Sequence, residues 1–377
     1  MRVLIVRLSS MGDLVCALPA VTDAANHYPE AQFDWVVDQP FSDVPSWHKA
    51  VDRVIQCPPR RGGRAFYQSL RNGKFSEFFR QIRQTHYDLI IDLHGDFKGA
   101  ITACLANGVR CGYDAKSVRE WGAHFAYQQK FFVARGLHSI TRMRRLMAYA
   151  LSYDHDDHHA QGVLPPIYGI DQSRLPSVPI PLRSPYLVFI HSTSWESKCW
   201  PESYWKQLAM IATSASFSVV LPWGNKKEQA RAIRIADQHD RVFVLPDLSI
   251  SQKASVIANA SATVGCDTGL SHIAAALSIP SVSIYGATDP VLCGTIGKNQ
   301  HCLSSHFECV KCRHSKCSYK KPTLSKPACL VEITPKMVWE NLQEVIIPVF
   351  IEDCAVGTGS NYSPPGPSLI LKEGRRK

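Results

Sequence analysis

The chain has 377 residues, of which 45% are hydrophobic and 20% are charged, and its formal net charge is +10. This composition is that of an ordinary globular protein, and the length favours two domains over one. No apolar run approaches the roughly 18 residues of a membrane span, and the apolar part of the N-terminus is too short for a signal peptide. These features exclude an integral membrane protein, and we expect a cytoplasmic one.

Basic residues are concentrated in the first half of the chain. Between positions 53 and 83, eight Lys or Arg residues stand against one acid, Glu77, and a second basic group lies between 116 and 145. A basic surface attracts nucleic acid, anionic lipid or phosphorylated substrates, although it can also be a merely solvated face. The stripe lacks the interleaved aromatic residues of a single-strand binder, and no nucleic-acid motif is present. Nucleic acid is therefore not an expected partner.

The first half alternates short apolar runs with helical patterns. Residues 3–6, 33–37 and 89–93 are predicted strands, and residues 75–84 and a stretch that ends near 27 are predicted helices. Strands that are apolar throughout and separated by helices indicate a parallel sheet covered on both faces.

Residues 152–184 differ from the rest of the chain. They contain an Asp/His cluster at 154–159 and then five Pro, with little periodicity, which is typical of an interdomain connection. Residues 154–156 have the Asp-x-Asp form of metal-dependent sugar transferases. Because they fall on a linker and not at a strand end, solvated polar residues are the expectation.

The second half repeats the alternation, with strands predicted at 186–190, 217–221, 242–244, 262–265 and 282–284 and helices between them. The fold class is therefore α/β, with two Rossmann-like, doubly wound parallel-sheet domains that face each other across a cleft. In such domains ligands bind at the carboxyl ends of the strands. The predicted domains are residues 1–165 and 180–346, with a Cys-rich insert at 302–329 and a disordered tail at 347–377.

Three loops at predicted strand ends could carry chemistry. In the first, residues 9–13, Gly12 allows close approach of the backbone to a ligand and Asp13 leaves a carboxylate exposed in the cleft. Asp13 could equally be a plain helix N-cap. The second loop, residues 191–198, offers hydroxyl groups and Lys198, which suit phosphate oxygens, although it could be only a polar loop.

The third loop, residues 267–272, lies where a helix begins. Helix N-termini present free N–H groups and a positive dipole end, so they bind phosphates, whereas Asp267 could be only an N-cap. Taken together, the three loops suggest a diphosphate-linked ligand in an interdomain cleft, with an acid on the opposite wall.

In their order and spacing these loops resemble glycosyltransferase family nine, the lipopolysaccharide heptosyltransferases, which have the GT-B fold. The resemblance runs from Met1 to about residue 346. The Phe-Asp-Trp-Val-Val segment at 33–37 and the Leu-Pro-Trp-Gly segment at 221–224 favour the branch called heptosyltransferase I, which adds the first heptose to Kdo of the lipid A inner core. The other matching segments are residues 9–13, 198–202, 267–272 and 285–290.

The resemblance implies an inverting transfer of heptose from ADP-L-glycero-β-D-manno-heptose, with Asp13 as the general base. Ser10, Gly12, Arg60, Arg61 and Arg119 would contact the acceptor. The donor would be bound by Thr193, Ser194, Lys198, Glu228, Leu248, Asp267, Thr268, Gly269, Leu270 and His272.

Such a transfer needs a base for the acceptor and charge stabilisation for the leaving group. Where a Lys and a helix N-terminus supply that stabilisation, catalysis requires no cofactor. The basic N-terminal face suits an anionic acceptor of the Kdo–lipid A type. We therefore expect a peripheral protein on the cytoplasmic face of the inner membrane, whose anionic surface attracts basic residues.

The sequence departs from the heptosyltransferase I pattern in several places. Ser194 stands where Thr is usual, residues 195–197 replace a more acidic stretch, and Leu248 occupies a position often held by Met near the adenine. A larger departure is a run of Cys residues after position 302, which resembles the second heptosyltransferase. It leaves open a related enzyme that acts on another core acceptor or uses another nucleotide sugar.

Four of the thirteen Cys form the pattern Cys309-x2-Cys312-x4-Cys317-x11-Cys329. Two-residue spacing lets two thiolates reach one ion, and four Cys ligands make a closed structural zinc site. Thiols of a cytoplasmic protein remain reduced, so a metal is a better partner than a disulfide. An iron–sulfur cluster could use the same ligands, and a loop whose thiols pack without metal is the plain alternative.

Overall fold

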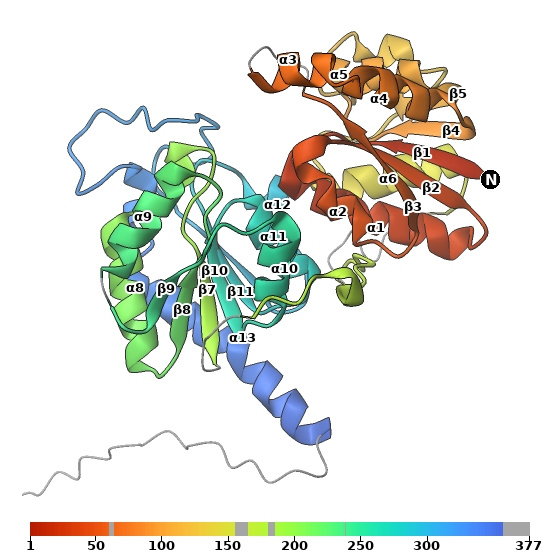
Figure 1. Cartoon of the computed structure of the whole chain (residues 1–377). Coiled ribbons are helices and arrows are strands. Elements are labelled where there is room, and N and C mark those ends of the chain that lie inside the picture. Colours follow the sequence, from red (N-terminus) through yellow and green to blue (C-terminus); the bar gives the residue numbers. More distant parts are fainter. Residues whose placement is uncertain (60–63, 155–164, 180–184, 238, 357–377) are drawn as a thin grey trace, which may run out of the picture.

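The computed structural model describes residues 1–59, 64–154, 165–179, 185–237 and 239–356. It contains two α/β domains that lie side by side and contact each other near the starts of helices α1 (Met11–His27) and α11 (Gly269–Ala276) (Figure 1). Arg60, Arg61 and the Asp/His cluster beyond Asp154 lie outside the described residues.

The described part of the N-terminal domain is built on a sheet of six parallel strands. These are β1 (Arg2–Val6), β2 (Gln32–Asp38), β3 (Val51–Cys57), β4 (His86–Asp92), β5 (Asn107–Tyr113) and β6 (Gln129–Phe131). Their order in the sheet is β3-β2-β1-β4-β5-β6. Successive side chains of β1 point to opposite faces, and Val3 to Val6 are all buried because helices cover both sides. The strands predicted at 3–6, 33–37 and 89–93 are confirmed.

Helices cover both faces of this sheet. They are α1, α2 (Asp43–Ser46), α3 (Arg64–Arg71), α4 (Lys74–Arg83), α5 (Phe97–Leu105) and α6 (Ser139–Leu151). α1 and α6 pack together against the face that carries Val3 and Ile5. α4 and α5 cover the opposite face, where Phe78, Ile82 and Ala103 meet Leu4.

The C-terminal domain repeats this plan, which confirms the predicted pair of doubly wound domains. Its strands are β7 (Tyr186–Ile190), β8 (Ser218–Leu221), β9 (Val242–Val244), β10 (Ala262–Cys266), β11 (Ser281–Tyr285) and β12 (Gln300–Ser304), all parallel. Their order is β12-β11-β10-β7-β8-β9. The helices are α8 (Glu202–Ser214), α9 (Lys226–Ala236), α10 (Ile250–Ala258), α11, α12 (Pro290–Cys293) and α13 (Pro335–Val356).

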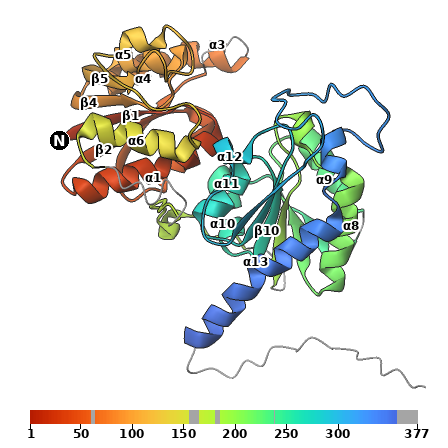
Figure 2. The ribbon, with the colours of Figure 1, turned by 180° about the vertical axis from the view of Figure 1, so that it is seen from behind.

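Two differences from the sequence-based expectation concern the C-terminal part. The edge strand β12 adds a strand that the apolar pattern did not predict, because its side chains are only partly buried. Helix α13 continues to Val356, past the boundary that we predicted at 346. Figure 2 shows this helix running along the C-terminal domain and projecting beyond it. None of the described helices is long and apolar enough to cross a membrane.

The domains are joined by a contact between α1 and α11, and their apolar side chains form one continuous core cluster. Two glycines permit this approach. A Cβ atom on Gly12 would lie 2.9 Å from the ring of His272, and one on Gly269 would lie 2.6 Å from the side chain of Met11. At a second contact, between the end of α2 and the start of α10, the Trp47 indole N–H donates to the Ser251 hydroxyl across the interface, at 2.9 Å.

The topology places particular loops at the cleft. In each sheet the strand order reverses beside the first strand, between β1 and β4 in one domain and between β7 and β10 in the other. Ligands of open α/β sheets bind outside the carboxyl ends of the strands at this reversal. The loops that follow these four strands therefore define the site.

Candidate active site

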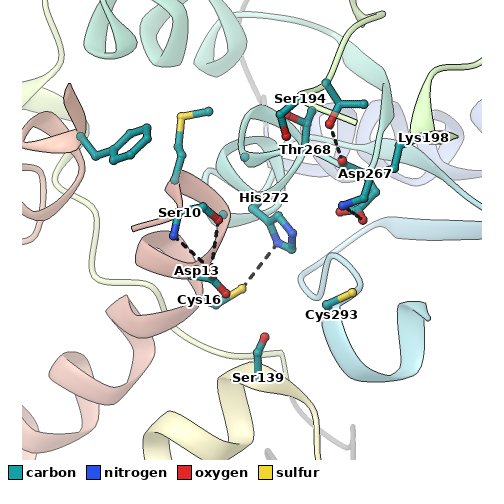
Figure 3. A pocket seen from close by; sticks show the side chains of 15 residues that line it. Ser10, Asp13, Cys16, Ser139, Ser194, Lys198, Asp267, Thr268, His272 and Cys293 are labelled. Carbon is teal, nitrogen blue, oxygen red and sulfur yellow. Dashed lines mark hydrogen bonds and ion pairs between the residues drawn. The ribbon is translucent and has the colours of Figure 1, made fainter. Parts of the chain in front are cut away.

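A cavity of about 350 Å³ lies between the two domains, where the loops after β1, β7 and β10 meet (Figure 3). The N-terminal domain contributes Ser10, Met11, Gly12, Asp13, Cys16, Phe41 and Ser139. The C-terminal domain contributes Thr193, Ser194, Lys198, Asp267, Thr268, Gly269, His272 and Cys293. All three loops that the sequence singled out thus line one cavity.

The N-terminal wall carries the carboxylate of Asp13 in the first turn of α1. One carboxylate oxygen lies 2.9 Å from the Arg7 guanidinium, and the other accepts hydrogen bonds from the backbone N–H and the hydroxyl of Ser10, at 3.1 and 3.0 Å. Ser10 is the N-cap of α1, and Asp13 stands three residues later. Because Ser10 holds the N-cap position, Asp13 is not the N-cap that was the alternative, and its side chain is about one third exposed.

Charge and hydrogen bonding hold Asp13 in its ionised form. Burial would raise the pKa of this carboxyl, but the Arg7 guanidinium and the hydrogen bonds from Ser10 outweigh burial and lower the pKa below its usual value. Arg7 is itself buried and donates to the carbonyl of Leu93, at 2.8 Å. The carboxylate is therefore ionised at neutral pH and faces the cavity.

A second, smaller cavity lies next to Asp13 and is lined by residues of the N-terminal domain. Its volume is about 130 Å³, and its lining includes three arginines, Arg7, Arg119 and Arg142. His94 also lines it, and its Nε2 lies 3.0 Å from the carboxylate of Asp96. Such a concentration of guanidinium groups suits a ligand that carries carboxylate or phosphate.

The C-terminal wall is organised around Asp267, which follows β10. Lys198 Nζ lies 2.7 Å from its carboxylate, and the Thr288 hydroxyl donates to the same oxygen at 2.5 Å. The Thr193 hydroxyl donates to the Asp267 backbone carbonyl at 3.2 Å. The Lys198 ammonium also lies 4.6 Å from the centre of the Trp195 ring. These contacts hold the Lys198 ammonium and the Thr193 hydroxyl on one side of the cavity.

The N-terminus of α11 opens into the same cavity. Its N-cap is Thr268, whose side chain makes no capping hydrogen bond, so the first N–H groups of the helix are available to an anion. His272, one turn later, is buried, and burial lowers its pKa although Asp267 and Asp13 act in the opposite direction. A neutral imidazole therefore lies between the acid of one wall and the helix start of the other.

A neighbouring cavity of about 340 Å³ extends the site along the C-terminal domain and shares Thr193, Ser194 and Thr268 with the first. Glu228 lines it and accepts hydrogen bonds from the Gly224 N–H and the Asn225 amide, at 2.7 and 2.8 Å. Its apolar lining includes Ile190, Trp223, Ile250 and Leu270. The two cavities together form a groove, with Asp13 and Lys198 at one end and a largely apolar lining that includes Glu228 and Lys253 at the other.

Comparison with known proteins agrees with this geometry. Residues 75–323, well over half of the chain, match the family described as glycosyltransferase family 9 (heptosyltransferase). The chain belongs to this family. It is 39% identical to lipopolysaccharide heptosyltransferase 1 of Pseudomonas aeruginosa over 92% of this chain and 98% of that protein. It is 40% identical to the Escherichia coli K12 protein of the same name, over 80% and 92% of the two chains.

A solved structure of the E. coli heptosyltransferase WaaC with ADP-2-deoxy-2-fluoro heptose superposes with a TM-score of 0.75 at 35% identity. The match covers 91% of this chain and 99% of that one. The comparison confirms the GT-B fold and the resemblance to family 9 that the sequence segments indicated. The protein is a glycosyltransferase of the heptosyltransferase family.

The predicted site residues of this glycosyltransferase fall into distinct places. Glu228 and Leu270 line the groove beyond the main cavity, and Arg119 lines the small cavity beside Asp13. Leu248 lines neither cavity of the groove, because it packs, partly buried, against the core cluster that spans both domains. The residues that share the main cavity are Ser10, Gly12, Asp13, Thr193, Ser194, Lys198, Asp267, Thr268, Gly269 and His272.

Several site residues were missed by sequence reasoning. Arg7 directly follows the apolar run of β1, and a buried charge at a strand end was a usable signal. His94 and Asp96 lie on the loop that follows β4. This loop is one of the four at the cleft, and we did not single it out in the sequence. Arg142 lies on α6, and nothing in its local sequence distinguishes it from the neighbouring arginines.

The structure gives no support to the zinc site that was one of the alternatives for the Cys-rich insert. Burial raises the pKa of the Cys329 thiol, and the thiols of Cys309, Cys312 and Cys317 raise it further. Within the described residues, however, no three His, Cys, Asp or Glu side chains converge enough to hold a metal ion. Cys329 is buried in the core of the C-terminal domain and Cys309 packs against that core, whereas Cys312 and Cys317 are partly exposed.

The insert instead contacts the loop that carries Lys198. Ser197 is buried, its backbone N–H donates to the carbonyl of Ser315 at 3.2 Å, and its hydroxyl donates to the carbonyl of His314. Lys316 and Ser315 line a further cavity next to Thr193 and Ser194. The insert is therefore bound to the loop that carries Lys198 by two hydrogen bonds.

Proposed function

We propose that this enzyme transfers L-glycero-D-manno-heptose from ADP-heptose to Kdo of the lipid A inner core, with inversion at the anomeric carbon. The observation that carries the proposal is the cavity in which the ionised Asp13 faces Lys198 and the start of α11. The relatives of 39% and 40% identity have the name of the first heptosyltransferase. Relatives named heptosyltransferase 2 or 3 match at only 24%, 20% and 27% identity, which favours this acceptor over the alternative.

The donor would lie along the groove of the C-terminal domain. Lys198, Thr193 and Ser194 would contact the diphosphate, and the N–H groups after Thr268 would add the positive end of a helix. Glu228 would accept hydrogen bonds from the ribose. The apolar end of the groove, with Ile250 and Leu270, would receive the adenine. These contacts fit one extended nucleotide diphosphate.

The acceptor would approach from the opposite wall. Asp13 would take the proton of the attacking Kdo hydroxyl while the oxygen forms a bond to the anomeric carbon of the heptose. The bond from that carbon to the diphosphate oxygen breaks at the same time, and the electron pair leaves with ADP. Because the base and the diphosphate site lie on opposite walls, attack comes from the far side of the sugar and inverts the configuration.

Charge stabilisation of the leaving diphosphate would come from the chain itself. Lys198 is held at the cavity by Asp267, and the α11 dipole points its positive end at the same place. We therefore propose that catalysis requires no metal ion or other cofactor, and that turnover persists in the presence of a chelator.

Recognition of the acceptor would use the arginines beside Asp13. Arg119 and Arg142 line the small cavity, where the Kdo carboxylates and the lipid A phosphates would meet them. Arg7 would contribute indirectly, because it already binds Asp13. Since the acceptor is anchored in a bilayer, we propose that the enzyme is cytoplasmic and works as a peripheral protein at the inner membrane.

The decisive test is incubation of the purified full-length protein with ADP-heptose and Kdo–lipid A, followed by mass spectrometry of the lipid. We expect a mass increase of one heptosyl residue, and none when ADP-heptose is replaced by a UDP-sugar. A parallel reaction with an acceptor that already carries the first heptose tests the second-heptose alternative. Product only in that reaction would refute the proposed acceptor.

A further inference from the structure

Helix α5 presents apolar side chains to solvent as well as to the core. Its inner face packs on the sheet through Ala100 and Ala103. On its outer face Phe97 is 51% exposed and Ile101 is 57% exposed, and Cys104 is exposed in the next turn. Positions four and three apart share one face of a helix, so these side chains form one outward stripe. Figure 1 shows α5 on the side of the domain turned away from α1.

A second element extends this stripe. The short 3₁₀ helix η2 (Ala123–Ala126) packs beside α5, and around it Trp121 is 71% exposed and Phe125 is 70% exposed. The two rings meet edge to face, with 6.0 Å between their centres. Gly122 has a φ of +100°, and the Phe97 ring lies 3.1 Å from where its Cβ would be. We call Phe97, Ile101, Trp121 and Phe125 the aromatic patch.

The aromatic patch has a fixed shape. The backbone N–H groups of Arg119 and Glu120 both donate to the carbonyl of Gly95, at 2.8 and 3.2 Å. The Glu120 carboxylate accepts a hydrogen bond from the N–H of Phe97, at 2.9 Å. These bonds attach the loop that carries Trp121 to the start of α5. The backbone that carries the exposed rings is therefore anchored to the domain and is not a free loop.

The surroundings of the aromatic patch are positively charged. Residues 95–135 contain six Lys or Arg and three acids. The Glu120 carboxylate accepts from the N–H of Phe97, and the Asp114 carboxylate accepts from the N–H groups of Lys116 and Ser117. These acids keep their charge, and the six basic residues of the segment still exceed its three acids by three positive charges. Lys116 and Arg119 are exposed. Exposed aromatic rings beside basic side chains are the combination that binds an anionic lipid surface.

The position of the aromatic patch matters for the reaction. Arg119 lines the small cavity beside Asp13, and Trp121 stands two residues after it. On the α5 side, Asp96 precedes Phe97 and pairs with His94 of the same cavity. The patch therefore borders the acceptor side of the site, while the donor groove lies in the other domain.

We propose that the aromatic patch is the surface by which this enzyme docks on an anionic lipid bilayer, with its rings at the depth of the headgroups beside the acceptor cavity. This inference rests on the proposed lipid-anchored acceptor. A second copy of the chain fits less well, because stable protein interfaces use roughly 20 to 30 residues a side. Peripheral membrane binding needs only a few inserted side chains and neighbouring positive charges.

The test uses full-length protein and sedimentation with sucrose-loaded vesicles of phosphatidylcholine, alone or mixed with phosphatidylglycerol. We expect the wild type to bind the mixed vesicles and to be released by salt. The affinity of the double variant W121S/F125S for the mixed vesicles should be lower by about tenfold or more. The affinity of Lys116→Gln should be lower by about fivefold. The matched control is M210S/I233S, which removes two side chains of 61% and 58% exposure from the C-terminal domain and should bind as the wild type does.

Kinetics separate docking from chemistry. With Kdo–lipid A in anionic vesicles, W121S/F125S should raise the acceptor KM, whereas its kinetics with a deacylated, water-soluble acceptor and its ADP affinity should equal those of the wild type. Equal binding of wild type and W121S/F125S to the mixed vesicles would overturn the inference. So would a dimer of the wild type, seen in sedimentation equilibrium, that W121S/F125S abolishes. If the enzyme transfers no heptose but its binding to vesicles still depends on the aromatic patch, the proposed function is refuted and the docking surface remains supported.

Discussion

Arg7 and Asp13 form an ion pair of 2.9 Å between the end of strand β1 and the first turn of the helix that follows it. The guanidinium is buried, whereas the carboxylate is about one third exposed to the cavity. The pair therefore joins a fixed charge of the core to a carboxylate that a substrate can reach. Its effect on the pKa of Asp13 leads to the first prediction.

Replacing Arg7 by Gln should move the pH dependence of the reaction. Arg7 lowers the pKa of Asp13, and a general base works only when it is deprotonated. In the wild type kcat/KM should therefore fall only at low pH, as Asp13 becomes protonated. In Arg7→Gln this acidic limb should shift to higher pH by about one to three pH units, as measured with a soluble acceptor. Asp13→Asn should lower kcat by roughly two to four orders of magnitude and leave ADP affinity nearly unchanged.

An unchanged acidic limb in Arg7→Gln, with a normal melting temperature, would contradict the assignment of Asp13 as the base. Near-normal turnover in Asp13→Asn would reduce Asp13 to a residue that stabilises the start of α1 through Ser10.

Lys198→Ala should weaken ADP binding by roughly ten- to a hundredfold, because a charge-assisted contact to phosphate is lost. The loss also leaves Asp267 without its cation, so the charge that repels the diphosphate increases. Isothermal titration with ADP measures the effect. Lys206→Ala is the matched control, since Lys206 pairs with Asp237 on the surface, at 2.9 Å, and does not line the donor groove. Equal ADP affinities in the two variants would contradict the proposed donor site.

Ser197→Ala tests the contact between the Cys-rich insert and the donor-side loop. The variant removes the hydroxyl that bonds to the His314 carbonyl, a contact that contributes about 0.5–1.5 kcal/mol. We expect a lower melting temperature and a few-fold weaker affinity for ADP, although Ser197 itself does not line the main cavity. Ser214→Ala, at an exposed position at the end of α8, should change neither quantity. If Ser197→Ala lowers stability alone, the insert supports the fold and not the donor site.

His48 should make the protein less stable in mild acid. It is fully buried, its Nε2 lies 2.8 Å from the Thr22 hydroxyl, and burial with the nearby Lys49 and Arg174 lowers its pKa to about 4. The unfolded chain binds a proton near pH 6.5, so between about pH 6.5 and 4 it holds more protons than the folded one. The contribution of the neutral His48 to the free energy of unfolding is fully present above this window and is lost as the pH falls through it. At pH 5 the loss is on the order of 2 kcal/mol.

The measurement is chemical unfolding of the wild type and of His48→Gln at pH 7 and pH 5. The variant should be less stable at pH 7, because it disturbs the bonds to Thr22 and to the Ala50 N–H. It should also lose less stability between the two pH values. An equal loss in both proteins would assign the acid sensitivity to other groups.

The elements that the sequence predicted well are those whose residue pattern is visible within the element itself. Strands such as β1 and β7 are apolar along their whole length because helices cover both faces of the sheet. Strand β3 was not predicted because it carries Arg53 in its middle. That charge is matched by Asp34 on the neighbouring strand, at 2.6 Å, and by the Tyr87 hydroxyl from β4, at 2.8 Å. Partners so far apart in the chain leave no periodic signal.

The residues of the candidate site also divide into those that have a local sequence signal and those that depend on distant partners. The loops at 9–13, 191–198 and 267–272 were identifiable because Gly, hydroxyl and charged residues follow apolar runs. The roles of Gly12 and Gly269 were not, because the close neighbours that require a glycine there belong to the other domain. His94 escaped notice for a related reason, since it meets Arg7 only when β1 and β4 pair.

The contact between α1 and α11 sets the distance between the two halves of the chemistry. Asp13 belongs to the first turn of one helix, and the N–H groups proposed to receive the diphosphate belong to the first turn of the other. Their separation is thus determined by how closely Met11 approaches Gly269 and Gly12 approaches His272, and not by the linker that joins the domains. A bulkier residue at either glycine would lengthen the path that the heptose must bridge, so such a substitution could impair transfer even where both substrates still bind.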